Sequence, residues 1–164
     1  MFPRPSQLPN KIEISNTSKE NRVFTLTALD SNLAEIALNR IKAELLKRKK
    51  AAVIAIADDH GELLALLRMD SAPIQSVTVA MNKAYTAARE GKPSSEIGAK
   101  MRDPQKGYSI QYYGDPRYTG FSGGVPVIVD GKTIGAVAVS GLSGVEDMEI
   151  AQLGVEAILN ATQK

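Results

Sequence analysis

Two pairs of short apolar segments, each joined by turn-forming residues, restrict the fold more than any other feature of this sequence. The first pair spans residues 52–57 and 63–67, and the second spans 125–129 and 133–140. Asp130-Gly131 joins the second pair, and this dipeptide favours a type I′ hairpin turn because it accepts positive φ. Two hairpins in one short chain predict an antiparallel sheet, not the parallel crossovers of a Rossmann sheet.

Helical periodicity surrounds these strands. Apolar residues recur at helical spacing over residues 30–50, where Asp30 is the expected N-cap, and over residues 77–88, before Gly91. A shorter helix is expected at 94–102, and the Ser143/Glu146 pair fits a capping box before a last helix. The sequence therefore predicts an α/β fold of the α+β type, with helices covering the sheet. Residues 1–22 are expected to form an N-terminal arm, and residues 23–164 one domain.

Composition removes several classes of function. The chain of 164 residues has 20 Lys+Arg against 18 Asp+Glu, so we predict no nucleic-acid partner. Its apolar runs are far shorter than the roughly 20 residues of a membrane-spanning helix, and no basic stretch with an apolar run opens it, so we expect a cytoplasmic protein without membrane contact. The sequence has no cysteine and a single histidine, His60, in a turn. We therefore expect no metal site, and an exposed structural role for His60. The basic run at residues 47–50 is either a polyanion patch or the cationic end of the first helix.

A long irregular connection at residues 103–124 concentrates the aromatic side chains. It contains Tyr108, Tyr112, Tyr113, Tyr118 and Phe121. Loops of this length commonly carry function. Two interpretations remain open: the rings hold the loop onto the domain, or they line a ligand pocket.

Polar residues follow the predicted strands. Asp58 ends the first strand and Arg68 follows the second, so we expect the hairpin to bring them together as a structural ion pair or a carboxylate-binding arginine. Lys83 lies off the apolar stripe of its helix, where a lysine is usually solvated; a catalytic lysine would have to be buried or placed beside a like charge.

Two glycine-rich turns could supply backbone amides to a ligand. Gly123-Gly124 precedes a strand, and Ser140-Gly141 leads from a strand toward a helix N-terminus. Such amides bind carboxylates, phosphates or haem propionates. Tight turning and capping by Ser143 explain the second segment equally well.

Several of these segments together resemble the GlcG/HbpS family, which includes the C-terminal domain of PduO-type proteins. The resemblance runs from about Thr25 to Leu159 and is carried by residues 53–58, 61–65, 68–70, 83–88, 123–127 and 135–141. It implies a profilin-like, three-layer α/β/α arrangement with a five-stranded antiparallel sheet. The fifth strand would lie within residues 21–26 or in the tyrosine-rich loop. The resemblance also implies homo-oligomers of up to eight subunits, and haem as a cofactor in some members.

Two functions are therefore expected. One is the binding of haem or another planar anionic or carboxylate ligand by Tyr108, Tyr112, Tyr118 and Thr119, with the turns at Gly123, Gly124, Ser140 and Gly141 holding its carboxylates. Thr119 or one of the loop tyrosines would then be the iron ligand. The alternative is a cofactor-free lyase, isomerase or hydrolase of a small carboxylic acid, in which Arg68 anchors the substrate and Asp58 or Lys83 moves a proton. Both expectations place these residues around a common cavity.

Overall fold

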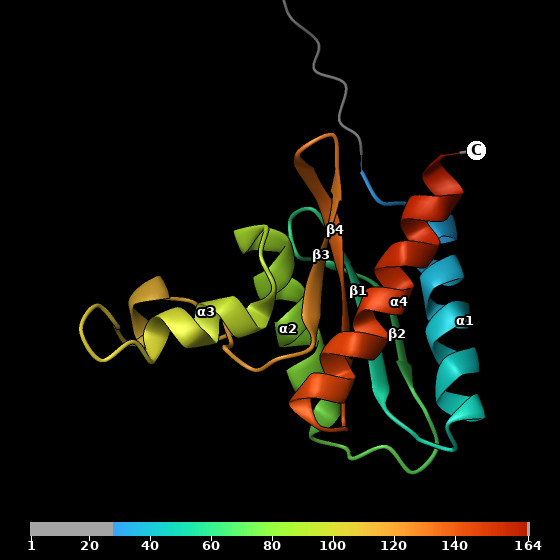
Figure 1. Ribbon diagram of the computed structural model, residues 1–164, viewed down its shortest axis with the longest axis horizontal. Helices are drawn as coiled ribbons and strands as arrows, with labels where there is room; N and C mark the ends of the chain where they lie inside the picture. Colours follow the sequence, from blue (N-terminus) through green and yellow to red (C-terminus); the bar gives the residue numbers. More distant parts are fainter. Residues whose placement is uncertain (1–27, 164) are drawn as a thin grey trace, which may run out of the picture.

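The computed structural model describes residues 28–163, which form a sheet with helices on both sides (Figure 1). The elements, in chain order, are α1 (Ser31–Lys47), β1 (Val53–Asp58), β2 (Leu63–Arg68), α2 (Ser76–Glu90), α3 (Ser94–Met101), a 3-10 turn η1 (Ile110–Tyr113), β3 (Gly124–Val129), β4 (Lys132–Ser140) and α4 (Gly144–Thr162). All the helices and hairpins expected from the sequence are confirmed.

The sheet has the strand order β2-β1-β4-β3, and every neighbouring pair is antiparallel. Asp130 and Gly131 turn the second hairpin with φ values of 50° and 75°, the positive values that a type I′ turn requires. Pro126, which has no N–H to donate, lies in the edge strand β3.

Helices cover both faces of the sheet, which gives the expected three layers. On one face, α1 and α4 pack against Ile54, Ile56, Val137 and Val139. The opposite face carries smaller side chains, because alanines of β1 and β4 meet alanines of α2. α2 can therefore approach the sheet closely, and Figure 1 shows it on the side opposite α1 and α4.

The sheet of the described residues has four strands, and the expected fifth strand is not among them. One place expected for it, residues 21–26, lies outside the described residues, as does the arm predicted for residues 1–22. The other place, the tyrosine-rich loop, contains turns and η1 instead, so that part of the expectation is wrong. Among residues 28–163, no helix combines the length and apolarity needed to cross a membrane.

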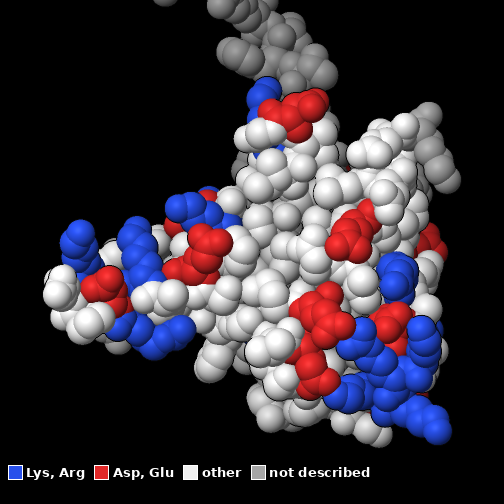
Figure 2. All heavy atoms as spheres, viewed as in Figure 1, with Lys and Arg blue, Asp and Glu red and all other residues white. Residues whose placement is uncertain are grey.

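Capping and ion pairs explain the ends of the two long helices. Asp30 accepts the Leu33 amide at 2.8 Å, and Ser143 with Glu146 forms the predicted capping box. At the C-terminal end of α1, Arg48 pairs with Glu44 and Glu149, and Lys50 pairs with Glu146. Figure 2 shows this basic end of α1 beside acidic side chains. The pairing favours the structural interpretation of the run at residues 47–50.

Candidate functional site

The expected pairing of Asp58 with Arg68 is wrong. In the antiparallel hairpin, Arg68 lies opposite Val53, whereas Asp58 lies at the turn end beside Gly61 and Glu62. The last residue of a strand meets the first residue of the next one, so these two side chains occupy opposite ends of the hairpin. Asp58 Oδ1 instead accepts the backbone amides of His60 and Glu62, each at 2.9 Å, and thereby closes the turn.

The histidine has the exposed turn position that the sequence predicts. His60 is 70% exposed, and its Nδ1 lies 2.9 Å from an Asp59 carboxylate oxygen. Asp58, Asp59 and His60 form the one cluster of metal-ligating groups among the described residues. Because Asp58 already serves the turn, this cluster is explained by local structure.

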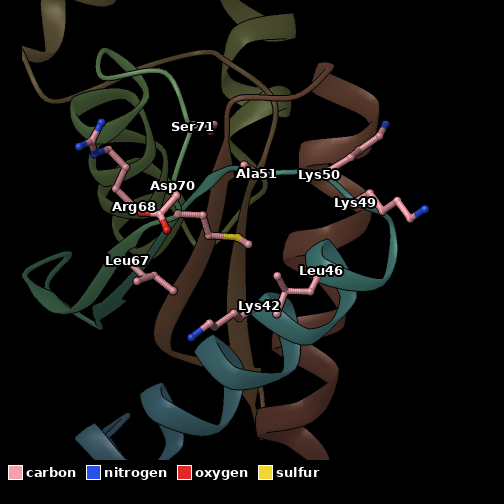
Figure 3. Close-up of a pocket in the computed structure, with 10 residues that line it drawn as sticks. Lys42, Leu46, Lys49, Lys50, Ala51, Leu67, Arg68, Asp70 and Ser71 are labelled. Atoms are coloured by element: carbon pink, nitrogen blue, oxygen red, sulfur yellow. The ribbon is translucent and has the colours of Figure 1, made fainter.

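Arg68 lines a hollow of about 450 Å³ at the C-terminal end of α1, together with Lys42, Lys49 and Lys50 (Figure 3). The four cations do not converge on a point. The Arg68 guanidinium extends toward one side of the hollow, whereas the ammonium groups of Lys49 and Lys50 extend toward the opposite side. An anion site needs donors aimed at a common centre, so this arrangement does not form one.

Lys83 is buried, which corrects the expectation of a solvated side chain. Only 3% of the residue is exposed. Its Nζ donates to Asp147 Oδ2 at 2.8 Å and to the Val139 carbonyl at 3.0 Å. Buried alanines, Ala80 and Ala87, lie one turn before and one turn after Lys83 on α2. The Lys83 side chain meets β4 and the first turn of α4, and the period of α2 alone does not reveal these contacts.

The glycines at 123 and 124 make room for this lysine. A Cβ on Gly123, whose φ is +121°, would lie 2.9 Å from Lys83 Nζ and 2.6 Å from the Val139 carbonyl oxygen. A Cβ on Gly124 would lie 2.3 Å from the Lys83 carbonyl oxygen. Their observed role is close packing; neither is among the residues that line the hollow in front of Lys83.

That hollow, of about 320 Å³, brings together three of the predicted residues: Lys83, Ser140 and Gly141. Ser76, Phe121 and Asp147 also line it. Asp147 is not among the predicted site residues, because an acidic residue in the first turn of a helix is ordinarily explained by the helix dipole.

A second hollow, of about 440 Å³, separates α3 from the tyrosine-rich loop. It contains the predicted residues Tyr108, Tyr118 and Thr119, whereas Tyr112 is 82% exposed and does not line it. The other lining residues are Gly98, Met101, Arg102, Ser109, Ile110, Gly120 and Phe121. α3 and the loop meet through backbone, since a Cβ on Gly98 would lie 2.1 Å from the Gly120 carbonyl oxygen.

Several rings of the tyrosine-rich loop hold it onto the domain, as one of the two interpretations expects. Tyr118 stacks on Tyr113 at 4.1 Å between ring centroids and meets Tyr85 of α2 edge-on at 5.5 Å. These contacts hold the loop against α2. Tyr108 lies at the open side of the same series of rings and faces the hollow.

The phenols of this loop differ in acidity. The Tyr113 hydroxyl, 3.3 Å from the Tyr108 hydroxyl, and the nearby Lys100 ammonium lower the pKa of Tyr108. Burial raises the pKa of Tyr118. Of the two phenols that line this hollow, Tyr108 and Tyr118, only Tyr108 has a lowered pKa.

A charged cluster fixes the base of the loop. The Tyr85 hydroxyl donates to Asp115 at 2.5 Å, and the Arg117 guanidinium lies 3.9 Å from the centroid of the Tyr85 ring. The Tyr85 and Arg117 hydrogen bonds hold the pKa of Asp115 well below its usual range. Burial, and then the Asp115 bond, raise the pKa of Tyr85 to about 12.

Fold and hollows define a three-layer α/β/α domain with two adjacent cavities of small-ligand size, one rich in phenols and one around a buried lysine. The chain belongs to the family described as haem degrading protein HbpS-like, whose profile matches residues 29–156. The family resemblance found in the sequence is thereby confirmed.

Relatives support this placement over most of the chain. Protein GlcG of Escherichia coli K12 is 37% identical over 119 residues, which cover 71% of this chain and 84% of GlcG. The crystal structure of Klebsiella pneumoniae protein ORFY superposes with a TM-score of 0.79 at 27% identity, covering 85% of this chain and 96% of ORFY. The crystal structure of a PduOC:heme complex superposes with a TM-score of 0.74 at 26% identity, covering 80% of this chain and 95% of the PduOC chain.

Proposed function

We propose that this chain binds a planar, mostly apolar molecule that carries anionic groups, of which haem is the leading example, in the hollow between α3 and the tyrosine-rich loop. The observation that carries the proposal is Tyr108. Its phenol faces the hollow, and its neighbours lower its pKa. Tyrosinate is one of the axial ligands that proteins supply to haem iron.

The chemistry of the lining fits such a ligand. Met101, Ile110 and Phe121 offer apolar surface, and Arg102 offers a cation for a carboxylate. Thr119 supplies a second hydroxyl. Haem bound here would contribute the redox chemistry of its iron, while the chain would bind it, orient it and neutralise its propionates.

The relatives point in the same direction. This chain belongs to a family described as haem-degrading, and the similar PduOC structure is a complex with haem. The enzyme alternative, in which Arg68 acts with Asp58 or Lys83, has less support. Asp58 lies at the opposite end of the hairpin from Arg68, and Arg68 and Lys83 line different hollows.

Haem titration followed by absorbance tests the proposal, with the matched variants Tyr108→Phe and Tyr112→Phe. We expect a saturable Soret shift in the wild type, at least about tenfold weaker binding in Tyr108→Phe, and no change in Tyr112→Phe, whose ring lies outside the hollow. A wild type that gives no Soret shift at micromolar haem, or a Tyr108→Phe variant that binds like the wild type, would refute it.

We also propose that the chain forms homo-oligomers, up to the octamer that the family resemblance implies. β2 is an edge strand with exposed leucines. Leu63 and Leu66 lie opposite Ala57 and Ala55, which face α2, so both leucines extend on the side of α2, where Met81 is also exposed. An edge strand with an apolar face is a surface that a second copy can cover.

A further inference from the structure

The hollow in front of Lys83 is lined by two serines that are almost completely buried. Ser76 and Ser140 line it, and each residue is only 5% exposed. Within the part of the chain that the structure describes, neither hydroxyl has a hydrogen-bond partner, and no polar side-chain atom that is fully sealed from solvent lacks one. The two hydroxyls are therefore accessible from the hollow, where water or a ligand atom can form hydrogen bonds with them.

Lys83 adds a third donor. An ammonium group carries three N–H donors, and Lys83 uses two of them, on Asp147 and on the Val139 carbonyl. Asp147 is occupied on both oxygens, because Oδ1 accepts the Leu142 amide at 3.1 Å and Oδ2 accepts Lys83. The carboxylate at the base of the hollow is thus already neutralised, and one N–H of Lys83 remains.

The N-terminus of α4 reaches the same hollow through Gly144. Ser143 caps the amide of Glu146. The amides of the first helical positions ordinarily lack an intrahelical acceptor, and the helix dipole makes this end attractive to negative charge. This end adds to the two serine hydroxyls and the lysine, which already define the site.

We propose that this hollow, lined by Ser76, Lys83, Ser140 and Gly144, binds a short-chain carboxylate, separately from the planar ligand of the tyrosine-rich loop. The Lys83 ammonium and the amides of α4 only donate hydrogen bonds, and the serine hydroxyls can donate as well as accept them, so a ligand that supplies acceptors suits the hollow. A singly charged carboxylate suits it better than a phosphate dianion, because the only ammonium is already paired with Asp147. Its volume of about 320 Å³ fits an acid of a few carbons, and Phe121 and Val79 offer apolar contact to the alkyl part.

The test is a set of titrations with acetate, propionate, lactate and inorganic phosphate, followed by the backbone amide NMR shifts of the labelled protein at constant ionic strength. We expect saturable shifts centred on Gly141 and Gly144 with the carboxylates. Ser76→Ala and Ser140→Ala should each weaken binding about three- to tenfold, the effect of losing one hydrogen bond. Ser109→Ala, a matched change in the other hollow, should leave carboxylate binding unchanged.

The serine variants keep the Lys83–Asp147 pair, and their amide spectra without ligand show whether they are folded, so that a failure to fold is distinguished from a loss of binding. Haem titration of Ser140→Ala should match the wild type, which separates this inference from the proposed function. The inference is overturned if no carboxylate shifts Gly141 or Gly144, if phosphate binds more tightly than the carboxylates, or if Ser76→Ala and Ser140→Ala bind like the wild type.

Discussion

The Lys83 ammonium lies 2.8 Å from the Asp147 carboxylate, and both side chains are almost completely buried, at 3% and 4% exposure. This ion pair joins the middle of α2 to the first turn of α4, on the same edge of the domain where β4 ends. An ion pair this deeply buried costs much of its attraction in desolvation, but removing one partner leaves the other charged and unpaired.

Removing the lysine should therefore destabilise the fold. We expect Lys83→Met to lower the free energy of unfolding by about 3–5 kcal/mol, and the double variant Lys83→Met/Asp147→Asn to recover part of that loss because no buried charge remains. Denaturant unfolding measures both. Lys92→Met, at an exposed lysine just after the same helix, is the control. A loss below about 1 kcal/mol for Lys83→Met would contradict the buried pair.

Gly123 should tolerate a methyl group worse than a glycine with nearly the same φ and more room around it. A Cβ on Gly123, at φ +121°, would clash with the Val139 carbonyl, Asp147 and Lys83, whereas a Cβ on Gly141, at φ +125°, would meet nothing closer than 3.4 Å. Gly123→Ala and Gly141→Ala strain the backbone alike, so the difference between them isolates the clash. We expect Gly123→Ala to be the less stable by about 2 kcal/mol or more in thermal or chemical unfolding. Equal losses would show that the segment can move aside.

The Asp115 carboxylate should stabilise the protein in a pH-dependent way. Its pKa in the folded state lies below 3.8, the usual value, because Tyr85 and Arg117 donate hydrogen bonds to the charged form. A depressed pKa gives stability that is fully present above pH 3.8 and is lost as the pH falls below it. The wild type should therefore exceed Asp115→Asn in unfolding free energy at neutral pH, and the difference should shrink in acid. A difference that persists unchanged into acid would contradict the assigned bonds.

If the chain forms oligomers through the edge of β2, a charge placed on that edge should lower the molar mass, whereas a charge placed on α1 should not. Leu66→Glu places a charge on the apolar side of the β2 edge and should lower the molar mass measured by light scattering. Leu46→Glu, at a leucine that is 59% exposed on α1, should leave the mass unchanged. A monomeric wild type, or an equal effect of both variants, would refute this interface.

Local sequence signals predicted the fold well. Asp130-Gly131, the Ser143/Glu146 box and the helical apolar stripes act over a few residues, so hairpins, caps and helices could be read from them. The relative positions of side chains that lie far apart in the sequence were harder to predict. Asp58 and Arg68 are each the last residue of their strand, and antiparallel register places the last residues of two paired strands at opposite ends of the hairpin.

The site was predicted only in part, for a related reason. Tyr108, Tyr118 and Thr119 share one hollow, and Lys83, Ser140 and Gly141 share another, but a single common cavity was expected. Burial of Lys83 depends on what α2 packs against, and its partner Asp147 lies 64 residues away in sequence. No period or motif in either helix marks that contact.

The most direct test of the central proposal is to map where a planar porphyrin binds. Backbone amide NMR shifts of the labelled protein, titrated with diamagnetic metal-free protoporphyrin, report the site residue by residue. We predict that the largest shifts fall on Gly98, Ser109 and Gly120, around the hollow between α3 and the tyrosine-rich loop. Shifts centred instead on the turn at His60 and Gly61, with Gly98 and Gly120 unaffected, would contradict the proposal.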